Sequence, residues 1–318
     1  MAFVPASSLV HTDKVLTAFA VGYEPAGFIG KRLLTPVPTN GEMSGKFRTR
    51  NKDNMLRESN VEVGELGLPA EVEAGYGSTS YACENYSAMA RVPVNIALQA
   101  DIPLNLRMDG VKVAKMRVDM AQERRIADLV STTSNYASTN YTTLAGTAQW
   151  SDYNNSDPIG DVDTYRETIF ASPDAKLVAW MGLSVWLKIK EHPQILERIK
   201  FGGNNGAPAK TALQALAEIF EVDEVLVGRI RSTATNPGQT ASYSRMWGKD
   251  FGIAAVEPGQ STMFLGFGAL FVYQNAEVSE VFEPLPGLKG VDVIKVANSV
   301  DEVIAANDAG CVIKAAVA

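Results

Sequence analysis

The residues with the best spacing for metal chemistry lie in the run DYNNSDPIGDVD, residues 152–163. Four oxygen-bearing side chains occupy positions one, three, five and twelve of a calcium-binding loop: Asp152, Asn154, Ser156 and Asp163. The match is incomplete, because Asp157 stands where the loop requires glycine and the last ligand is Asp instead of Glu. Asp157 followed by Pro158 is also typical of a helix start, with Asp157 as the N-cap. We therefore predict a helix start here and assign no metal, with calcium binding as the alternative.

The sequence contains two histidines, His11 and His192. His11 lies in the N-terminal segment, and His192 precedes Pro193 at a predicted helix end, where a positive charge suits the helix dipole. The sequence has no glycine-rich phosphate loop, dinucleotide fingerprint or nucleophile elbow. Gly266 and Gly268 lie in an apolar run and indicate close packing. We predict that the protein is not an enzyme and has no catalytic residue, metal site or cofactor.

Two cysteines in a chain of this length, Cys83 and Cys311, form neither a disulfide framework nor a metal knuckle. We expect two separate reduced thiols, as in a cytosolic protein. Three aromatic residues, Tyr136, Tyr141 and Trp150, have no basic residue between them. A single-stranded nucleic-acid site needs aromatic and basic residues together, so that function is not indicated.

The composition is that of a folded soluble protein. The chain has 318 residues, of which 46% are hydrophobic and 20% charged, with a formal net charge of -7. An acidic balance argues against a protein whose main task is to grip nucleic acid, although it does not exclude DNA that lies nearby without specific contacts. The sequence has neither an apolar run long enough for a bilayer nor a signal peptide in its first residues, MAFVPASSLVHTDK. We expect folding and assembly in the cytoplasm.

The most unusual stretch is a long connection at residues 51–91, which follows a strictly alternating strand at 46–50. Its charges are segregated along the chain. Residues 46–57 carry five basic residues and one acid, and residues 58–84 carry six acids and no base. A connection of this length is usually functional or disordered. It is either a two-stranded arm that reaches over a neighbouring subunit, where opposite charges steer docking, or a mobile surface loop.

Elements around this connection must position it. Residues 1–28 resemble an arm that becomes ordered only against something else, and 31–38 read as extended. After the connection, the alternation of Val92, Val94, Ile96 and Leu98 predicts a half-buried strand. A long helix is predicted over 109–131. Its apolar face is expected to contain Val113, Met116, Met120, Ala127 and Val130, with Lys115 and Asp119 on the polar side.

The remainder mixes short helices and strands, after a polar loop at 132–150. We predict helices at 157–170, 183–191 and 208–220. Strands are predicted at 176–182, 222–231, 244–256, 264–273 and 310–317.

Several local sequences, in this order, resemble tailed-bacteriophage major capsid proteins of the Hong Kong 97 type, a family related to the encapsulins. They are GTAQWSDYNNSDPIGDV (146–162), KLVAWMGLSVWLKIKEHPQILERIK (176–200), ALQALAEIF followed by VDEVLVG (212–228), and RMWGKDFGIAAV (245–256). No single motif is specific, and the ordered set over nearly the whole chain carries the resemblance. The resemblance implies an α+β fold with an N-terminal arm, an extended loop, a peripheral domain with a long spine helix, and an axial domain.

The resemblance also implies boundaries for these parts. The expected order is an N-terminal arm at 1–30, a peripheral-domain strand at 31–45 and the extended loop at 46–91. The peripheral domain with its spine helix follows at 92–132, the axial domain at 133–300, and a C-terminal strand that returns to the peripheral domain at 301–318. We predict hinges at the joints near Gly45 and Pro93.

Members of the resembled family form pentamers and hexamers that close an icosahedral shell around double-stranded DNA. The implied partners are further copies of the chain, a portal, DNA held without sequence specificity and, where present, a decoration protein. Only about 30 residues precede the first body strand, and the chain begins with Met1, so we expect a separate scaffolding protein. Lys52 is a conceivable cross-linking donor, but no acceptor is identifiable and cross-linking is not expected. The expected location is the virion, after assembly in the host cytoplasm, and the alternative function is an encapsulin-like nanocompartment shell.

Overall fold

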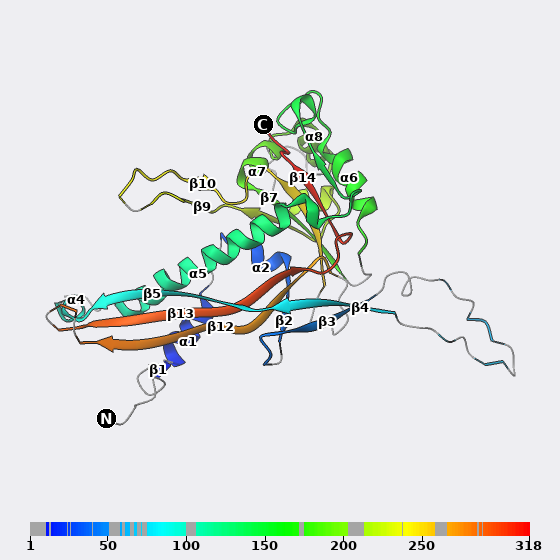
Figure 1. Cartoon of the computed structure of the whole chain (residues 1–318). Coiled ribbons are helices and arrows are strands. Elements are labelled where there is room, and N and C mark those ends of the chain that lie inside the picture. Colours follow the sequence, from blue (N-terminus) through cyan, green and yellow to red (C-terminus); the bar gives the residue numbers. More distant parts are fainter. Residues whose placement is uncertain are drawn as a thin grey trace.

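The computed structural model describes the chain from residue 11 to residue 318 in an α+β fold built on two five-stranded sheets (Figure 1). Outside the description are residues 1–10, 13, 24, 26, 40, 51–57, 59–60, 64–66, 69–70, 72–74, 100–105, 172–174, 203–212, 237, 258–265, 285 and 288. Among the helices described, none has the length and apolar composition needed to cross a bilayer.

The first sheet, here called the long sheet, is built on two long antiparallel strands, β12 (Gly268–Glu283) and β13 (Val291–Ile304). β5 (Glu84–Pro93) pairs antiparallel with the other edge of β13. β1 (His11–Thr12) and β2 (Thr35–Pro38) both pair with β12, β1 antiparallel and β2 parallel. Buried β-branched residues occupy both faces of β13, Val291 and Val293 on one face and Ile294 and Val296 on the other, as suits a strand that is packed on both sides. The sequence prediction missed β13.

α5 (Leu106–Ser131) runs along one face of the long sheet and begins three residues before the predicted helix. Its apolar side chains Val111 and Ala114 pack with Val92 and Ile294 of the sheet. The predicted helix was right, but most of its predicted buried face was wrong. Val113 is 58% exposed, whereas Ala127 and Val130 are buried as expected.

A polar network explains the error in the predicted face. Lys115 and Asp119, both expected on the outer side, are buried and form an ion pair of 2.8 Å. Lys31, in the short helix α2 (Gly30–Leu33), reaches the same Asp119 carboxylate at 3.1 Å. Buried charges are tolerated when they are paired, so an apolar stripe alone did not identify this face.

The N-terminal segment contains a helix that the sequence prediction missed, α1 (Lys14–Gly22). Leu16 and Ala20 on this helix are buried against Val278 of β12 and Ala114 of α5. The described part of the expected arm is therefore ordered against the chain's own body.

The second sheet has the order β6, β14, β11, β7, β8. These strands are β6 (Tyr141–Thr143), β14 (Gly310–Lys314), β11 (Phe251–Val256), β7 (Lys176–Gly182) and β8 (Glu224–Gly228). The helices beside it are α6 (Pro158–Thr168), α7 (Leu183–Ile189), α8 (Pro193–Gly202) and α9 (Leu213–Ile219), with the 3-10 turns η2 (Thr133–Asn135) and η3 (Gly146–Ala148). Trp150, Phe220 and Phe251 are buried in the core of this half.

Two predicted boundaries divide the chain differently from the way its strands pair. The C-terminal strand β14 was expected to return to the peripheral domain, but it pairs with β11 and β6 in the second sheet. Residues 268–300 were placed in the axial domain, but β12 and most of β13 lie in the long sheet beside β5. Strand partners far apart in sequence are decided by tertiary pairing, which local periodicity does not contain.

The return from the extended loop also differs from the prediction. β5 begins at Glu84, whereas the returning strand was predicted at Val92. Val94–Gln99 is the helix α4 rather than a strand, with Ile96 56% exposed. Alternation over seven residues was therefore a misleading signal.

Other segments also differ from the prediction. Residues 244–256 form two strands, β10 (Ser244–Arg245) and β11, separated by a turn in which Gly248 has φ 58°. The predicted strand at 222–231 divides into β8 and β9 (Arg231–Ser232), and β9 pairs with β10 as a separate hairpin. Residues 31–34, predicted as extended, lie largely in α2.

A shared core joins the two sheets. Ile126 and Val130 of α5 lie in one buried cluster with Trp180 of β7. The same cluster contains Phe267, just before β12, and Val300 of β13. Side chains from both sheets therefore exclude water together, which favours folding as one unit.

Candidate assembly surfaces

The acidic run at 152–163 is used for local structure. The Asp152 carboxylate accepts hydrogen bonds from the backbone N–H of Asn154, at 3.1 Å, and from the Asn155 amide, at 2.9 Å. Asp157 caps α6 as predicted, and its Oδ1 accepts from the Gly160 N–H at 3.1 Å. In the described part of the chain, no three His, Cys, Asp or Glu side chains come together in a way that could hold a metal ion.

His192 is completely buried, and its Nε2 lies 3.2 Å from the Ser156 hydroxyl. The Ser156 hydroxyl donates to the Asp152 carbonyl oxygen at 2.6 Å, so its proton is already used and Nε2 acts as the donor in the contact with His192. A serine oriented in this way is not activated as a nucleophile. Burial lowers the pKa of His192, with the nearby Asp157 charge acting in the opposite direction. Burial of the ring therefore opposes the positive charge that was expected at this helix end.

Both cysteines are buried and free, as two separate thiols were expected to be. Burial raises the pKa of Cys83, and it raises that of Cys311 to about 12. Because the thiolate is the reactive form, these thiols are poor nucleophiles. His11 lies in β1, whose backbone pairs with β12.

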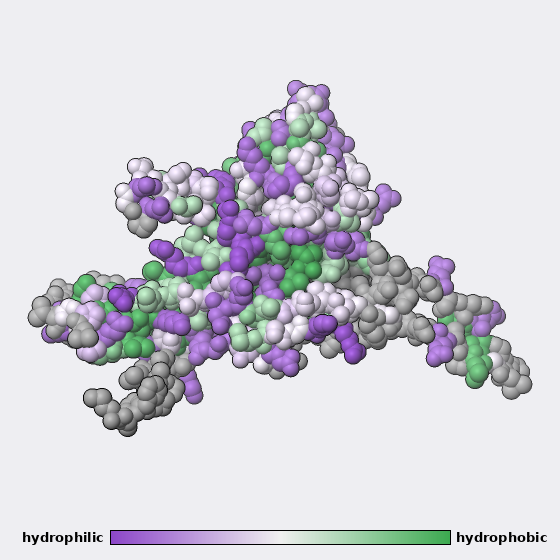
Figure 2. All heavy atoms as spheres, viewed as in Figure 1, coloured by the Kyte–Doolittle hydropathy of each residue, from purple (hydrophilic) through white to green (hydrophobic). Residues whose placement is uncertain are grey.

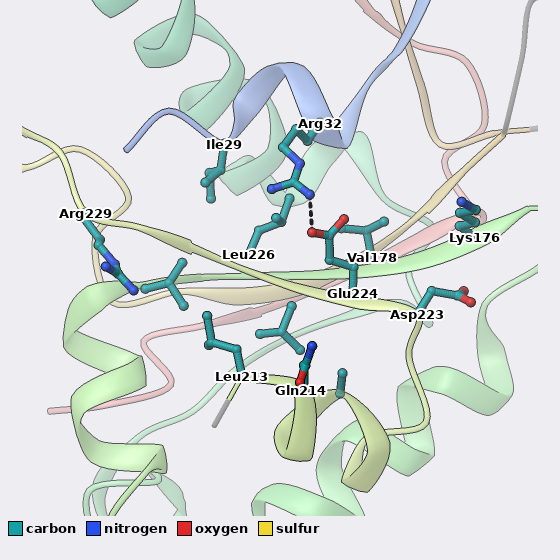
Figure 3. Close-up of a pocket in the computed structure, with 13 residues that line it drawn as sticks. Ile29, Arg32, Lys176, Val178, Leu213, Gln214, Asp223, Glu224, Leu226 and Arg229 are labelled. Carbon is teal, nitrogen blue, oxygen red and sulfur yellow. Dashed lines mark hydrogen bonds and ion pairs between the residues drawn. The ribbon is translucent and has the colours of Figure 1, made fainter. Parts of the chain in front are cut away.

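A groove of about 630 Å³ lies along β8, the outer strand of the second sheet, between α2 and α9 (Figure 3). Arg32 of α2 forms an ion pair with Glu224 across it. Asp223 is also occupied, since its carboxylate accepts from the Leu177 N–H at 2.8 Å. These acids are committed to partners within the chain. The rest of the lining is mainly aliphatic, with the polar side chains Lys176, Gln214 and Arg229 at the groove. The groove therefore offers a packing surface more than a reaction site.

The sequence prediction missed a buried carboxylate that links three segments. Glu123 of α5 accepts hydrogen bonds of 2.8 Å from the backbone N–H of Ile29, the backbone N–H of Gly30 and the indole Nε1 of Trp247. Burial raises the pKa of Glu123, while the three donated hydrogen bonds act in the opposite direction. This carboxylate therefore fixes α2 and the turn before β11 to the long helix α5. The isolated Trp-Gly pair in a polar turn was the only signal that the sequence offered for it.

The extended loop begins as a two-stranded ribbon, in agreement with the predicted two-stranded arm. β3 (Ser44–Arg50) pairs antiparallel with β4 (Tyr76–Ala82), and the ribbon projects away from the body (Figure 1). At its base, the rings of Phe47 and Tyr81 pack on Phe271 of β12, with centroid distances of 4.7 and 4.4 Å. The ribbon is therefore anchored at one end by an aromatic cluster.

The two predicted hinges lie at this joint and at the end of β5. Gly45 lies within β3, and a Cβ atom there would approach the Tyr81 ring to 2.9–3.2 Å. A larger residue at position 45 would therefore collide with Tyr81, which explains why glycine occurs there without invoking a hinge. Pro93 is the last residue of β5, next to α4. Motion at either joint stays a prediction.

Several charged and apolar side chains of the arm are exposed. Lys46 and Arg48 alternate with Phe47 and therefore point away from the aromatic cluster. Further along, three apolar side chains are exposed: Val61 at 71%, Val63 at 44% and Leu68 at 93%. Figure 2 shows hydrophobic colour on the arm. Exposed apolar residues clustered on a projecting segment are typical of an interaction surface. Lys52, Arg57, Glu65 and Glu73, on which the charge argument also rests, lie outside the described residues.

Sequence comparison finds relatives along most of the chain. The chain is 26% identical to the major capsid protein of Pseudomonas phage JBD67 over 317 residues, which covers 96% of this chain and 97% of that protein. It is also 26% identical to the major capsid protein of Burkholderia phage BcepMu over 262 residues, covering 79% and 78% of the two chains. No protein-family model matches the sequence.

Solved structures have the same fold. A phage-related protein from Bordetella bronchiseptica RB50 matches with a TM-score of 0.74 at 23% identity, covering 96% of this chain and 97% of that one. The capsid of cyanophage P-SCSP1u matches with a TM-score of 0.56 at 8% identity, covering 92% and 89%. At these identities the likeness concerns the fold, and it confirms the expected Hong Kong 97-type capsid fold.

Proposed function

We propose, from the premise that this chain is a phage major capsid protein with the Hong Kong 97-type fold, that its copies assemble as pentamers and hexamers into the icosahedral head shell of a tailed phage. The shell would enclose double-stranded DNA. The observation that carries the proposal is the 26% identity to the JBD67 major capsid protein along 96% of the chain. A heterologous contact repeated around five- and six-fold axes closes rings, as shell assembly requires.

The shape of the chain supports this role. In the proposed assignment, the long sheet with α5 is the peripheral domain, and the second sheet with α6, α7, α8 and α9 is the axial domain. The ribbon β3–β4 would be the extended loop that lies over an adjacent subunit. The exposed Val61, Val63 and Leu68, which lie in the sequence between the two strands, would then be buried, and each buried apolar side chain of this size contributes about 1.5–3 kcal/mol.

We propose no catalytic activity for the chain. The strongest pair for such activity, Ser156 and His192, is buried, and the hydroxyl proton is occupied by a backbone carbonyl. The role of the side chains is then structural, in folding and in contacts between subunits.

The proposed partners are other copies of the chain, a separate scaffolding protein, a portal and packaged DNA, with a decoration protein where the phage encodes one. The proposed location is the virion, after assembly in the host cytoplasm. These proposed partners rest on the similarity to capsid proteins.

Electron microscopy of the purified protein after size-exclusion chromatography tests the proposal. Closed angular shells of uniform size are the expected result, and their contents separate the two shell functions. DNA or scaffolding protein inside would support a phage head, whereas an enzyme cargo would support an encapsulin-like compartment instead. Particles that stay small even with a co-expressed scaffolding protein would contradict shell formation.

A further inference from the structure

The hairpin formed by β9 and β10 belongs to a stretch of the chain that carries basic residues but no acidic residue of its own. The stretch from Arg229 to Lys249 contains four basic residues and no acid: Arg229, Arg231, Arg245 and Lys249. The chain as a whole has a net charge of -7, so the hairpin differs in sign from the molecule that carries it.

Two of these arginines face each other across the hairpin. Arg231 is the direct antiparallel partner of Arg245. The pairing continues to Ile230, whose carbonyl accepts from the Met246 N–H at 3.1 Å, and Arg229 lies one residue further along. Side chains directly opposite on two strands lie about 5 Å apart at Cβ, and like charges in that position are destabilising. The arrangement is unfavourable unless an anion lies against it.

The hairpin arginines differ from most other arginines of the described chain. Six described arginines form ion pairs with carboxylates: Arg32, Arg91, Arg107, Arg124, Arg125 and Arg166. In the part of the chain that the structure describes, the guanidinium groups of Arg229, Arg231 and Arg245 have no ion pair. The counter-charge is therefore expected from outside the subunit.

The remaining side chains of the hairpin are suited to phosphate contacts. Between the two strands the sequence TATNPGQTASY is rich in hydroxyl and amide groups, and Tyr243 is 65% exposed. Hydroxyl, amide and guanidinium groups supply most contacts that proteins make to the nucleic-acid backbone. The hairpin projects from the body as a narrow two-stranded ribbon, with mainly hydrophilic or neutral colours on its surface (Figures 1 and 2). A ribbon of this kind fits the major groove of double-stranded DNA.

The base of the hairpin is held firmly. Met246 and Trp247, which follow β10 directly, are buried in one cluster with Ile126 and Ala127 of α5, and Trp247 donates to Glu123. Within the loop, the Thr235 hydroxyl accepts from the Ser242 N–H at 3.1 Å. A charged ribbon on a rigid base loses little conformational entropy on binding.

We propose that the β9–β10 hairpin contacts the sugar-phosphate backbone of double-stranded DNA through Arg229, Arg231 and Arg245. The inference rests on the proposed function and deepens it, because it identifies the surface of the subunit that faces the packaged DNA. The contacts are to phosphates and carry no sequence preference.

Binding of the purified, unassembled chain to a fluorescein-labelled DNA duplex of about two helical turns tests the inference by fluorescence anisotropy. Three phosphate contacts predict a slope of about -2.7 for log affinity against log salt, so affinity should fall about 40-fold between about 50 and 200 mM salt. The variant R229Q/R231Q/R245Q should lose most of this salt-dependent affinity. Its thermal unfolding midpoint should equal or exceed that of the wild type, because the like-charge pair has been removed.

The matched control is K188Q/R198Q/K289Q, which removes the same charge from exposed positions elsewhere. It should bind the duplex as the wild type does. Equal losses in the two variants, or no loss in the hairpin variant, would overturn the inference. Electron microscopy of the same proteins keeps the proposed function separate, since shells formed by the hairpin variant would leave that function intact. Unchanged duplex affinity with loss of shells would also overturn the inference, and would indicate carboxylates of a second copy as the anion.

Discussion

Glu123 holds three segments of the chain through one buried carboxylate. Its oxygens accept from Ile29, Gly30 and Trp247, each at 2.8 Å. Gly30 is required at this point, because a Cβ atom there would lie 2.7 Å from the Glu123 carboxylate. Three N–H groups that converge on one acceptor lose their partner together when that acceptor is removed.

We expect Glu123→Ala to destabilise the fold strongly. Each buried donor left without a partner costs about 1–3 kcal/mol, so the total should reach several kcal/mol. Glu123→Gln should cost less, because its amide oxygen can still accept. Chemical denaturation of the unassembled chain measures the free energy of unfolding of each variant, and we expect it to fall from the wild type through Glu123→Gln to Glu123→Ala. Asp128→Asn on the exposed side of the same helix, where Asp128 pairs with Arg124 at 3.0 Å, is the control and should cost under about 1 kcal/mol.

His192 should make stability depend on pH. Its pKa is lowered in the folded state by burial, so the unfolded chain binds the proton more readily. The contribution of neutral His192 to the free energy of unfolding is therefore fully present above the unfolded pKa of about 6.5, and it is lost as the pH falls below that value. The loss has a limiting slope of about 1.4 kcal/mol for each pH unit.

Unfolding free energies of the wild type and His192→Gln at several pH values between about 7.5 and 5 test this expectation. The difference between the two proteins should shrink as the pH falls, since only the wild type loses the contribution of His192. A difference that stays constant across this range would contradict it. His11 is present in both proteins and cancels.

The acidic loop should tolerate loss of the predicted calcium ligands. Asp152→Ala with Asp163→Ala removes two loop carboxylates that are exposed or partly exposed, and we expect shells to form as in the wild type. The measurement is electron microscopy together with the unfolding midpoint in the presence and absence of calcium. A calcium-dependent rise in the wild-type midpoint that the variant lacks would revive the metal hypothesis.

At the scale of elements, the ribbon β3–β4 and the helix α5 show different kinds of surface. The ribbon is fixed at its base by Phe47 and Tyr81 against Phe271, and beyond that point its charges face outwards. The helix places its charges Lys115, Asp119 and Glu123 inside. Charge on the ribbon therefore lies on an exposed surface, and charge on the buried side of the helix is used within the fold.

Reversing the basic strand of the arm should weaken assembly. We expect Lys46, Arg48 and Arg50 changed to Glu to reduce the yield of shells, most clearly at low salt. The reason is the Debye length, which is about 30 Å at 0.01 M salt and about 10 Å at 0.1 M, so salt screens the steering charges. Light scattering during assembly at both salt concentrations measures the effect, with K188E/R198E/K289E as the control for net charge. Equal assembly of the arm variant and the wild type at low salt would refute charge steering.

At the scale of the whole molecule, the two sheets share a core. Ile126 of α5 packs with Trp180 of β7 and Phe267, in a cluster that also contains Val300 of the long sheet. The halves that we propose as peripheral and axial domains are therefore not independent, because neither could separate without exposing this cluster.

We expect the unassembled subunit to unfold in one transition. Trp180 and Trp247 lie in the shared cluster with ring centroids 5.4 Å apart, so their fluorescence reports on the junction between the halves. The fluorescence and the far-ultraviolet circular dichroism should change at the same denaturant concentration. Fluorescence that changes at a clearly lower concentration would instead indicate two units that separate before they unfold.

The sequence by itself determined the elements whose signals are local. The N-cap at Asp157, the strand β7 and the existence of α5 follow from neighbouring residues, because caps and periodicity act over a few positions. The ribbon also followed from a local cue, the alternation around Lys46, and the resemblance of ordered segments gave the fold class.

Only the tertiary structure decided what depends on distant partners. The pairing of β14 with β11, the membership of β12 and β13 in the long sheet, and the buried face of α5 depend on residues far away in sequence. Lys115 and Asp119 were predicted on the polar side because isolated charges are costly to bury, and Glu123 was not singled out at all. Their burial is stable only because Lys31, Ile29, Gly30 and Trp247 supply partners, and the folded chain alone brings these together.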